Sequence, residues 1–179
     1  MSGTHSQTRV LAEGAVIVAL TIVLRDFLPP IYRLPQGGSV SAAGMVPLLW
    51  FALRRGPRAG LEAGGVYGLV NMALGGYIVD PVQALLDYPI AFAALGLAGL
   101  LRTHPLLGVT LGLFGRFLAH FISGAWFFWM YVPDAAGAFD TPAIVYSAAY
   151  NGSYMIIELI ISLIIIYVIQ KRHLLEIFL

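Results

Sequence analysis

The sequence carries ionisable side chains inside long apolar stretches, and these are the first candidates for chemistry. Five of them lie well inside such stretches: Glu62, Asp87, Arg116, His120 and Glu158. In a segment that crosses a membrane, an ionisable group costs several kcal/mol unless it is paired or hydrated. Groups of this kind bind a ligand, line an ion pathway or pair with each other, so each of the five is a candidate for binding.

Ion pairing is the alternative to ligand binding for the carboxylates. Arg116 has two potential partners in the sequence, Asp87 and Glu62. At a rise of about 1.5 Å per helical residue, Arg116 and Glu62 fall at similar depth, which favours their pairing. Asp87 would then have no basic partner in the protein and would await a cationic ligand. The spacing alone leaves a structural Asp87 and a ligand-binding Asp87 equally open.

Depth also groups a set of polar residues in the opposite half of the membrane. By the same estimate Asp87, His120, Tyr146 and Asn151 lie at comparable depth. Aromatic residues crowd the last two apolar stretches: Trp126, Phe127, Phe128, Trp129, Tyr131, Tyr146, Tyr150 and Tyr154. A cation bound between aromatic faces gains stacking and cation–π energy. The alternatives are a hydrogen-bonded core histidine and the aromatic belt of a membrane surface.

Motifs for catalysis and for energy coupling are missing from the sequence. There is no G-x-x-x-x-G-K-[ST] loop for ATP, no cysteine, and no second histidine or acid at metal-ligand spacing from His120. Ser123 lies one helical turn from His120, but no acid is placed to orient this histidine, so an intramembrane hydrolase is a weak interpretation. We expect no enzyme activity, no metal site and no bound cofactor.

Composition places these residues in a membrane protein. Of the 179 residues, 59% are hydrophobic and 11% are charged, and the net charge is +1. A soluble domain has roughly 25% charged residues, so a soluble globular chain and a disordered chain are both excluded. The small net charge offers no basic surface to nucleic acid. Because about 20 apolar residues cross a bilayer, this length suits six helices with short loops.

The apolar stretches predict a single all-α integral membrane domain over residues 1–179, with six transmembrane helices. The predicted spans are residues 9–27, 39–54, 58–75, 80–101, 104–131 and 142–170. Continuous apolar runs such as Leu159–Ile169 lack the alternation of a β-barrel strand. Basic residues gather at one set of helix ends, which predicts that both termini are cytoplasmic. The opposite ends carry acidic residues, interpreted as solvated loop charges: Asp26, Asp80, Asp134 and Asp140.

Six stretches carry a resemblance to one known family. They are residues 34–41 (LPQGGSVS), 45–56 (MVPLLWFALRRG), 80–92 (DPVQALLDYPIAF), 96–99 (GLAG), 116–124 (RFLAHFISG) and 146–154 (YSAAYNGSY). In this order and spacing they resemble the thiamin-specific S-components (the ThiT family) of energy-coupling factor (ECF) vitamin transporters. The resemblance extends over about residues 9–170.

The resemblance implies a six-helix S-component with a substrate cavity near the outer surface. It implies that these residues contact thiamin, with the carboxylate facing the thiazolium: Asp87, His120, Tyr146, Asn151, Tyr88 and Gly124. One further aromatic contact falls on Phe128 or on the neighbouring Trp129. Some relatives have a tryptophan in the first loop, for which Tyr32 or Gln36 would substitute here.

The resemblance also implies partners. Ala15 and Ala19 match the family's small-residue surface for a coupling transmembrane subunit, which acts with two cytoplasmic ATPases. Thiamin would cross the prokaryotic plasma membrane when the S-component topples in the lipid bilayer. Two alternatives stay open, an S-component for another vitamin or a thiamin precursor, and an intramembrane enzyme that uses His120 and Ser123. An anionic or neutral substrate would leave Asp87 unexplained.

Overall fold

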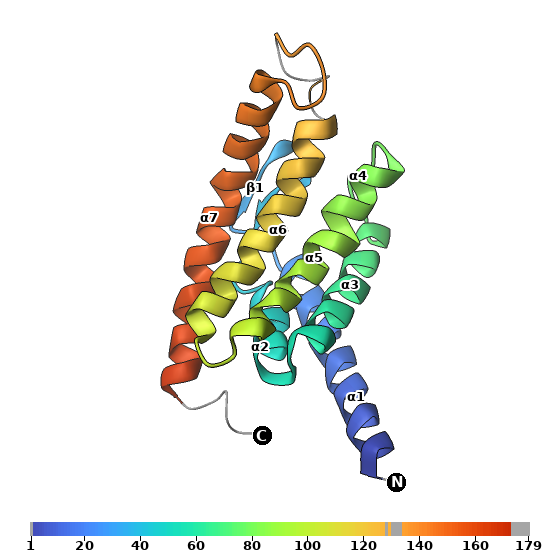
Figure 1. Ribbon diagram of the computed structural model, residues 1–179, viewed down its shortest axis with the longest axis vertical. Coiled ribbons are helices and arrows are strands. Elements are labelled where there is room, and N and C mark those ends of the chain that lie inside the picture. Colours follow the sequence, from blue (N-terminus) through green and yellow to red (C-terminus); the bar gives the residue numbers. More distant parts are fainter. Residues whose placement is uncertain (1, 128, 130–133, 173–179) are drawn as a thin grey trace.

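The computed structural model describes residues 2–127, 129 and 134–172, which form an elongated helical bundle (Figure 1). The helices and strands are α1 (Ser2–Ile22), the π-helical turn η1 (Val23–Phe27), β1 (Tyr32–Arg33), the 3-10 turn η2 (Pro35–Gly37), β2 (Ser39–Val40), α2 (Val46–Arg55), α3 (Pro57–Ala73), α4 (Pro81–Leu85), the π-helical turn η3 (Leu86–Ile90), α5 (Ala91–Ala93), the 3-10 helix η4 (Ala94–Leu101), α6 (Pro105–Phe127) and α7 (Thr141–Lys171).

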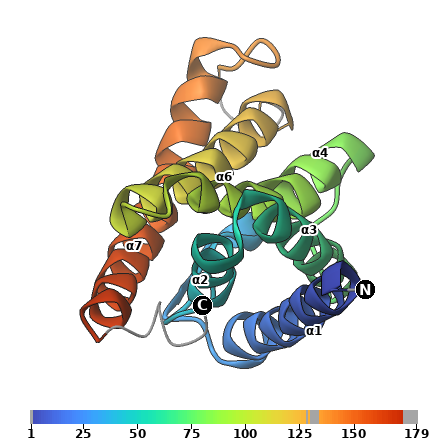
Figure 2. The same cartoon turned by 60° about the horizontal axis from the view of Figure 1, so that its bottom comes forward.

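The predicted six-helix, all-α architecture is confirmed. Elements α4, η3, α5 and η4 follow one another without a break, so the chain has six helical segments over the described residues. Three of them are long and apolar enough to cross a membrane: Pro81–Leu101, Pro105–Phe127 and Thr141–Lys171. Figure 2 shows α2 between α1 and α7, while α1 leans away from the rest of the bundle.

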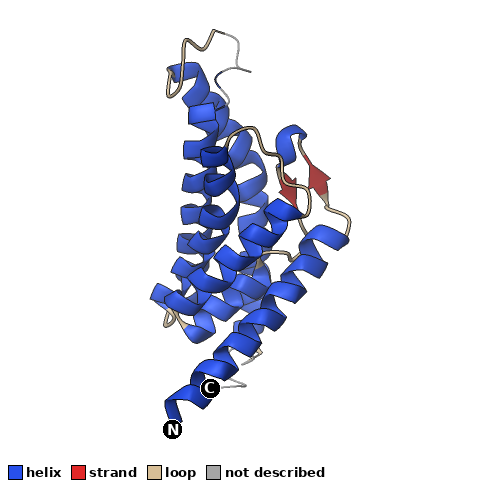
Figure 3. Ribbon diagram, turned by 90° about the vertical axis from the view of Figure 1, so that its right-hand side faces the viewer, coloured by secondary structure: helices blue, strands red, loops and turns tan. Residues whose placement is uncertain are grey.

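The second helix begins at Val46, later than the predicted span start at residue 39. The intervening chain forms a short antiparallel hairpin, in which Tyr32 pairs with Val40 and Arg33 with Ser39 (Figure 3). The backbone N–H and the hydroxyl of Ser41 both donate to Glu158 Oε1 of α7, at 2.7 and 2.9 Å. A buried carboxylate thus holds the first loop against α7, because it satisfies donors that no helix would satisfy there.

Glycines on α3 bring its backbone close to the segment that follows α4. A Cβ atom built on Gly68 would lie 2.5 Å from the carbonyl oxygen of Tyr88, and one built on Gly64 would collide with the carbonyl oxygen of Phe92. Small residues at four-residue spacing allow such close helix approach. Pro89 lies in the π-helical turn η3, whose irregular geometry tolerates a residue without an N–H. This contact places the end of α3 beside Asp87.

The apolar core lies between α2, α3, η4 and α6. Its largest fully buried apolar side chains include Phe51, Tyr67, Phe92, Leu49 and Leu95. The rings of Tyr67 and Phe92 meet edge to face with centroids 4.7 Å apart. Phe92 also lines a polar cavity beside this core, so its ring connects the core with that cavity.

Candidate ligand site

A small polar cavity of about 50 Å³ lies where the first loop, α3, η3, α6 and α7 meet. Its lining combines carboxylate, imidazole and amide groups with aromatic rings: Gln36, Gly37, Gly38, Asn71, Tyr77, Gln83, Asp87, Tyr88, Phe92, His120, Tyr150, Asn151 and Tyr154. Pockets for small ligands usually have about 300–1,000 Å³. In this conformation a ligand of vitamin size enters only if the loop or side chains move.

Asp87 is held at the cavity wall by two neighbours. Its Oδ2 accepts a hydrogen bond from Gln83 Nε2 at 2.7 Å, and its Oδ1 lies 2.9 Å from His120 Nδ1. Because an ionised carboxylate only accepts hydrogen bonds, both nitrogens are the donors. A carboxylate has about four lone-pair positions, so Asp87 keeps capacity to face a cation. Its side chain is 16% exposed, and the group is therefore oriented without being sealed off.

The expected pairing of Glu62 with Arg116 is wrong, and so is the alternative pairing of Asp87 with Arg116. Glu62 instead pairs with Arg58, one turn away on the exposed face of α3, at 3.1 Å. Arg116 is buried and stacks on the ring of Phe92 with its guanidinium carbon 4.6 Å from the ring centroid. Glu62 lies on the outward side of α3. An estimate of depth along the helix axis does not show which side of the helix a residue is on.

His120 presents its second nitrogen without a protein partner. The Nδ1 atom donates to Asp87, so the neutral ring keeps an acceptor at Nε2. That Nε2 is buried and has no hydrogen-bond partner among the described residues, and the same holds for the Ser123 hydroxyl. The expectation that no acid orients His120 is therefore wrong. A nucleophile–base pair is still missing, since these two buried atoms do not bond to each other.

The cavity-facing amide of Asn151 is tied to the protein. Its Oδ1 accepts from the Tyr154 hydroxyl at 2.9 Å, and its Nδ2 donates to the carbonyl oxygen of Ser147 at 3.0 Å. Gly124 packs against this amide, because a Cβ atom built there would lie 3.2 Å from Asn151 Nδ2. A ligand donor could still use the second lone pair of Asn151 Oδ1, whereas a ligand acceptor must exchange with an internal hydrogen bond of Nδ2.

The structure gathers most of the predicted site residues at this cavity. Five of them line it: Gln36, Asp87, Tyr88, His120 and Asn151. Tyr146 lies at the rim, where its hydroxyl donates to Gln36 Oε1 at 3.4 Å and its ring stacks on Tyr150. Trp129 is not among the lining residues, and Phe128 lies outside the described residues. Tyr32 lies in β1 with 52% of its surface exposed, so Gln36 is the first-loop side chain at the cavity.

Several lining residues were not predicted. Gln83 precedes Asp87 by four residues on one helix, a spacing that brings two side chains together and would have indicated it. Tyr150 and Tyr154 were noted only as aromatic faces. Asn71 and Tyr77 have no such signal, because α3 and the loop after it reach the cavity only through packing.

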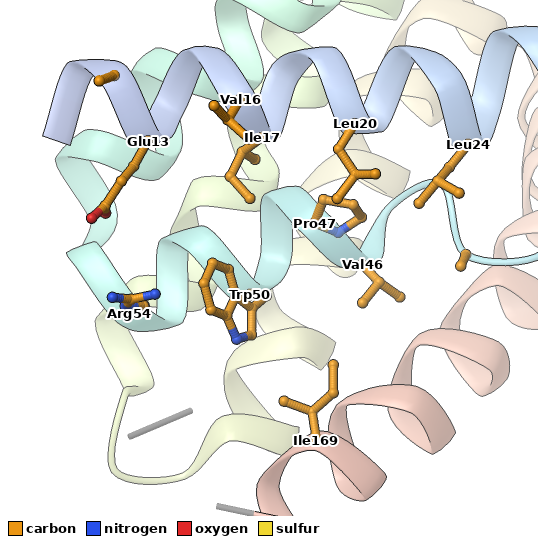
Figure 4. Close-up of a pocket in the computed structure, with 12 residues that line it drawn as sticks. Glu13, Val16, Ile17, Leu20, Leu24, Val46, Pro47, Trp50, Arg54 and Ile169 are labelled. Atoms are coloured by element: carbon orange, nitrogen blue, oxygen red, sulfur yellow. The ribbon is translucent and has the colours of Figure 1, made fainter. Parts of the chain in front are cut away.

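Two apolar grooves flank α1, away from the cavity. The α1–α2 groove, of about 760 Å³, is lined by α1, α2 and Ile169 of α7. In Figure 4 the α1 side chains of Ile17 and Leu20 face α2, while Glu13 and Arg54 lie at one end. On the other side of α1, the α1–α3 groove of about 460 Å³ contains the predicted interface residues Ala15 and Ala19.

Comparison with known proteins places the chain in a family. Residues 11–177 match the family described as Thiamine transporter protein (Thia_YuaJ). The chain belongs to this thiamine transporter family. Membership in a transporter family agrees with the absence of a nucleophile–base pair at His120, and the apolar helices fit a membrane protein.

Relatives in this thiamine transporter family match along nearly the whole chain. The thiamine transporter ThiT of Bacillus subtilis strain 168 is 36% identical over an alignment of 173 positions, gaps included, that covers 87% of this chain and 87% of the relative. ThiT of Lacticaseibacillus paracasei is 28% identical over an alignment of 186 positions that covers 90% of this chain and 87% of the relative. The solved structure of ThiT from Listeria monocytogenes superposes with a TM-score of 0.78 at 26% identity, covering 93% and 96% of the two chains.

Proposed function

We propose that this protein is the thiamin-binding S-component of an ECF transporter in a prokaryotic plasma membrane. One observation carries the proposal: a carboxylate with spare acceptor capacity, Asp87, lines an aromatic cavity in a chain of the thiamine transporter family. Thiamin joins a permanently charged thiazolium to a flat aminopyrimidine. The carboxylate supplies the counter-charge, and the rings of Tyr88, Tyr150 and Tyr154 supply faces for stacking and cation–π contact.

Under this proposal each polar group has a role in binding. Asp87 faces the thiazolium, and His120 Nε2 hydrogen-bonds the pyrimidine or the hydroxyethyl group. Tyr146 and Gln36 close the first loop over the ligand, since their side chains already bond at the rim. The volume of about 50 Å³ requires this loop or the lining side chains to move when thiamin enters.

Energy for uptake comes from other subunits, because the sequence has no ATP-binding loop. We propose that a coupling membrane subunit docks on Ala15 and Ala19 in the α1–α3 groove and connects the protein with two cytoplasmic ATPases. Toppling of the whole bundle would then carry the cavity to the inside. Basic residues at one set of helix ends support an orientation with both termini in the cytoplasm.

Titration calorimetry of the purified protein with thiamin tests the binding role. We expect tight 1:1 binding that Asp87→Asn weakens by about 1–3 kcal/mol, the range for a hydrogen bond to a charged group. Asp80→Asn is the matched control, because Asp80 caps α4 outside the cavity and asparagine caps equally well. The proposal fails if the folded wild type does not bind thiamin, or if Asp87→Asn and Asp80→Asn bind it equally well.

A further inference from the structure

Asn71 at the end of α3 connects the cavity with a carboxylate that the sequence placed among solvated loop charges. Asn71 lines the cavity, and its Nδ2 donates to Asp26 Oδ1 at 2.7 Å. Asp26 is partly buried in η1, where the Tyr67 hydroxyl donates to its Oδ2 at 3.0 Å. Tyr67 itself is fully buried. Asp26 therefore belongs to a fixed hydrogen-bond network directly behind the cavity wall.

This network determines which way the Asn71 amide points. The two ends of an asparagine amide have similar shapes, so the orientation follows from the hydrogen-bond partners. An ionised carboxylate only accepts, hence the NH₂ group of Asn71 must face Asp26. The carbonyl oxygen is therefore the end of the amide that does not face Asp26, and Asn71 is among the residues that line the cavity.

The carbonyl oxygens of the other cavity amides each already accept one hydrogen bond from the protein. Gln36 Oε1 accepts from Tyr146, Gln83 Oε1 accepts from the backbone N–H of Val79, and Asn151 Oδ1 accepts from Tyr154. Over the described part of the chain, Asn71 is thus the one cavity-lining amide whose oxygen has no protein donor. A polar group left without a partner in a binding site rejects ligands that cannot satisfy it.

We infer that Asn71 is a specificity-determining residue that accepts a hydrogen bond from a donor on the ligand, and that Asp26 is its positioning residue. The inference rests on the proposed function. Thiamin offers two such donors, the amino group of its pyrimidine and its hydroxyl group. A ligand with a carbonyl or a hydrogen in place of that donor leaves the Asn71 oxygen unsatisfied and is rejected.

Three ligands and three variants test this inference by calorimetry. The ligands are thiamin, oxythiamin, in which a carbonyl replaces the amino group, and an analogue with ethyl in place of hydroxyethyl. We expect the wild type to prefer thiamin over the analogue that lacks the donor bound by Asn71, whichever of the two donors that is. Asn71→Leu should reduce this preference about fivefold. Asp26→Asn should reduce it as well, because an amide at position 26 can donate and lets the Asn71 amide turn over.

Tyr67→Phe is the matched control, since it removes the other donor to Asp26 and leaves the bond to Asn71 in place. We expect this variant to keep the wild-type preference. A merely structural role would weaken all three ligands equally, so an unchanged preference in both Asn71→Leu and Asp26→Asn overturns the inference while thiamin binding still stands. Absence of thiamin binding by the wild type overturns the proposed function and this inference with it.

Discussion

The polar cavity and the α1–α2 groove differ in size and in chemistry. The groove has about 760 Å³ and is lined almost entirely by apolar side chains of α1 and α2, whereas the cavity has about 50 Å³. The smaller space nevertheless holds the convergent polar groups, among them Asp87, His120 and Asn71. Such groups orient a ligand and distinguish it from its analogues.

In a membrane, the large size of the apolar α1–α2 groove does not by itself indicate a ligand site. Lipid tails are as apolar as leucine, so a groove lined by leucine, valine and isoleucine has no preference for a vitamin over its surroundings. Under the proposed function, volume alone would therefore point away from the thiamin site. The following predictions test whether binding is confined to the cavity and docking to the sides of α1.

The largest expected effect is on transport. Ala15→Trp fills the α1–α3 groove and should abolish ATP-driven thiamin uptake, because a bulky side chain prevents close helix approach there. Thiamin affinity of the purified variant should remain unchanged, since Ala15 does not line the cavity. Uptake of labelled thiamin at equal expression measures this, with Ile160→Trp at an exposed position of α7 as the control. Normal uptake by Ala15→Trp would remove α1 from the docking surface.

The next effect is on binding. His120→Ala should weaken thiamin binding about 10- to 100-fold, because it removes the unpartnered Nε2 and one of the two donors that orient Asp87. Trp50→Leu in the α1–α2 groove should change the dissociation constant less than twofold. A larger loss for Trp50→Leu than for His120→Ala would assign thiamin to the groove.

The third effect is on the contact that shapes the cavity. Gly68→Ala places a methyl group against the carbonyl oxygen of Tyr88 and should cost about 1–3 kcal/mol of stability, with weaker thiamin binding. Gly65→Ala, on the same helix, meets only the Ala93 side chain at 3.9 Å and should leave both unchanged. Thermal unfolding in detergent compares them, and equal melting temperatures would contradict the close α3–η3 contact.

The smallest effect lies outside the membrane, at the start of α7. Backbone N–H groups of Ala136 and Thr141 donate to Asp140, which lowers the pKa of its carboxyl below the ordinary value. A lowered folded-state pKa means that this contribution is present above the unfolded pKa and is lost as pH falls through the folded one. The protection factors of amides in the first turn of α7, which compare each exchange rate with the intrinsic rate at the same pH, should therefore fall in acid.

Asp140→Asn is the control for that acid effect, because it keeps a capping oxygen and cannot titrate in this range. The ionised carboxyl adds a small favourable interaction with the helix dipole that the amide lacks, so protection should differ slightly between wild type and Asp140→Asn at neutral pH and become equal in acid. An identical pH profile for the two proteins would show that Asp140 does not cause the change.

Much of the architecture could be predicted from the order of residues. The apolar stretches predict six helices, and helical periodicity together with family resemblance brings Asp87, His120 and Asn151 to one cavity. The start of the second helix was missed, since the hairpin that delays it depends on pairing between Tyr32 and Val40. Ion pairs were missed for a related reason, because estimates of depth ignore rotation about the helix axis.

The sequence by itself determined that this chain enters a membrane, because its apolar content and scarcity of charge admit no other solvent. It also determined which acids and amides are available for binding. The tertiary structure alone decided their partners. Asp87 meets His120 and Asp26 meets Asn71 across gaps of 33 and 45 residues. Such contacts depend on how the helices pack and on the rotation of each helix about its axis, which local spacing along the chain does not fix.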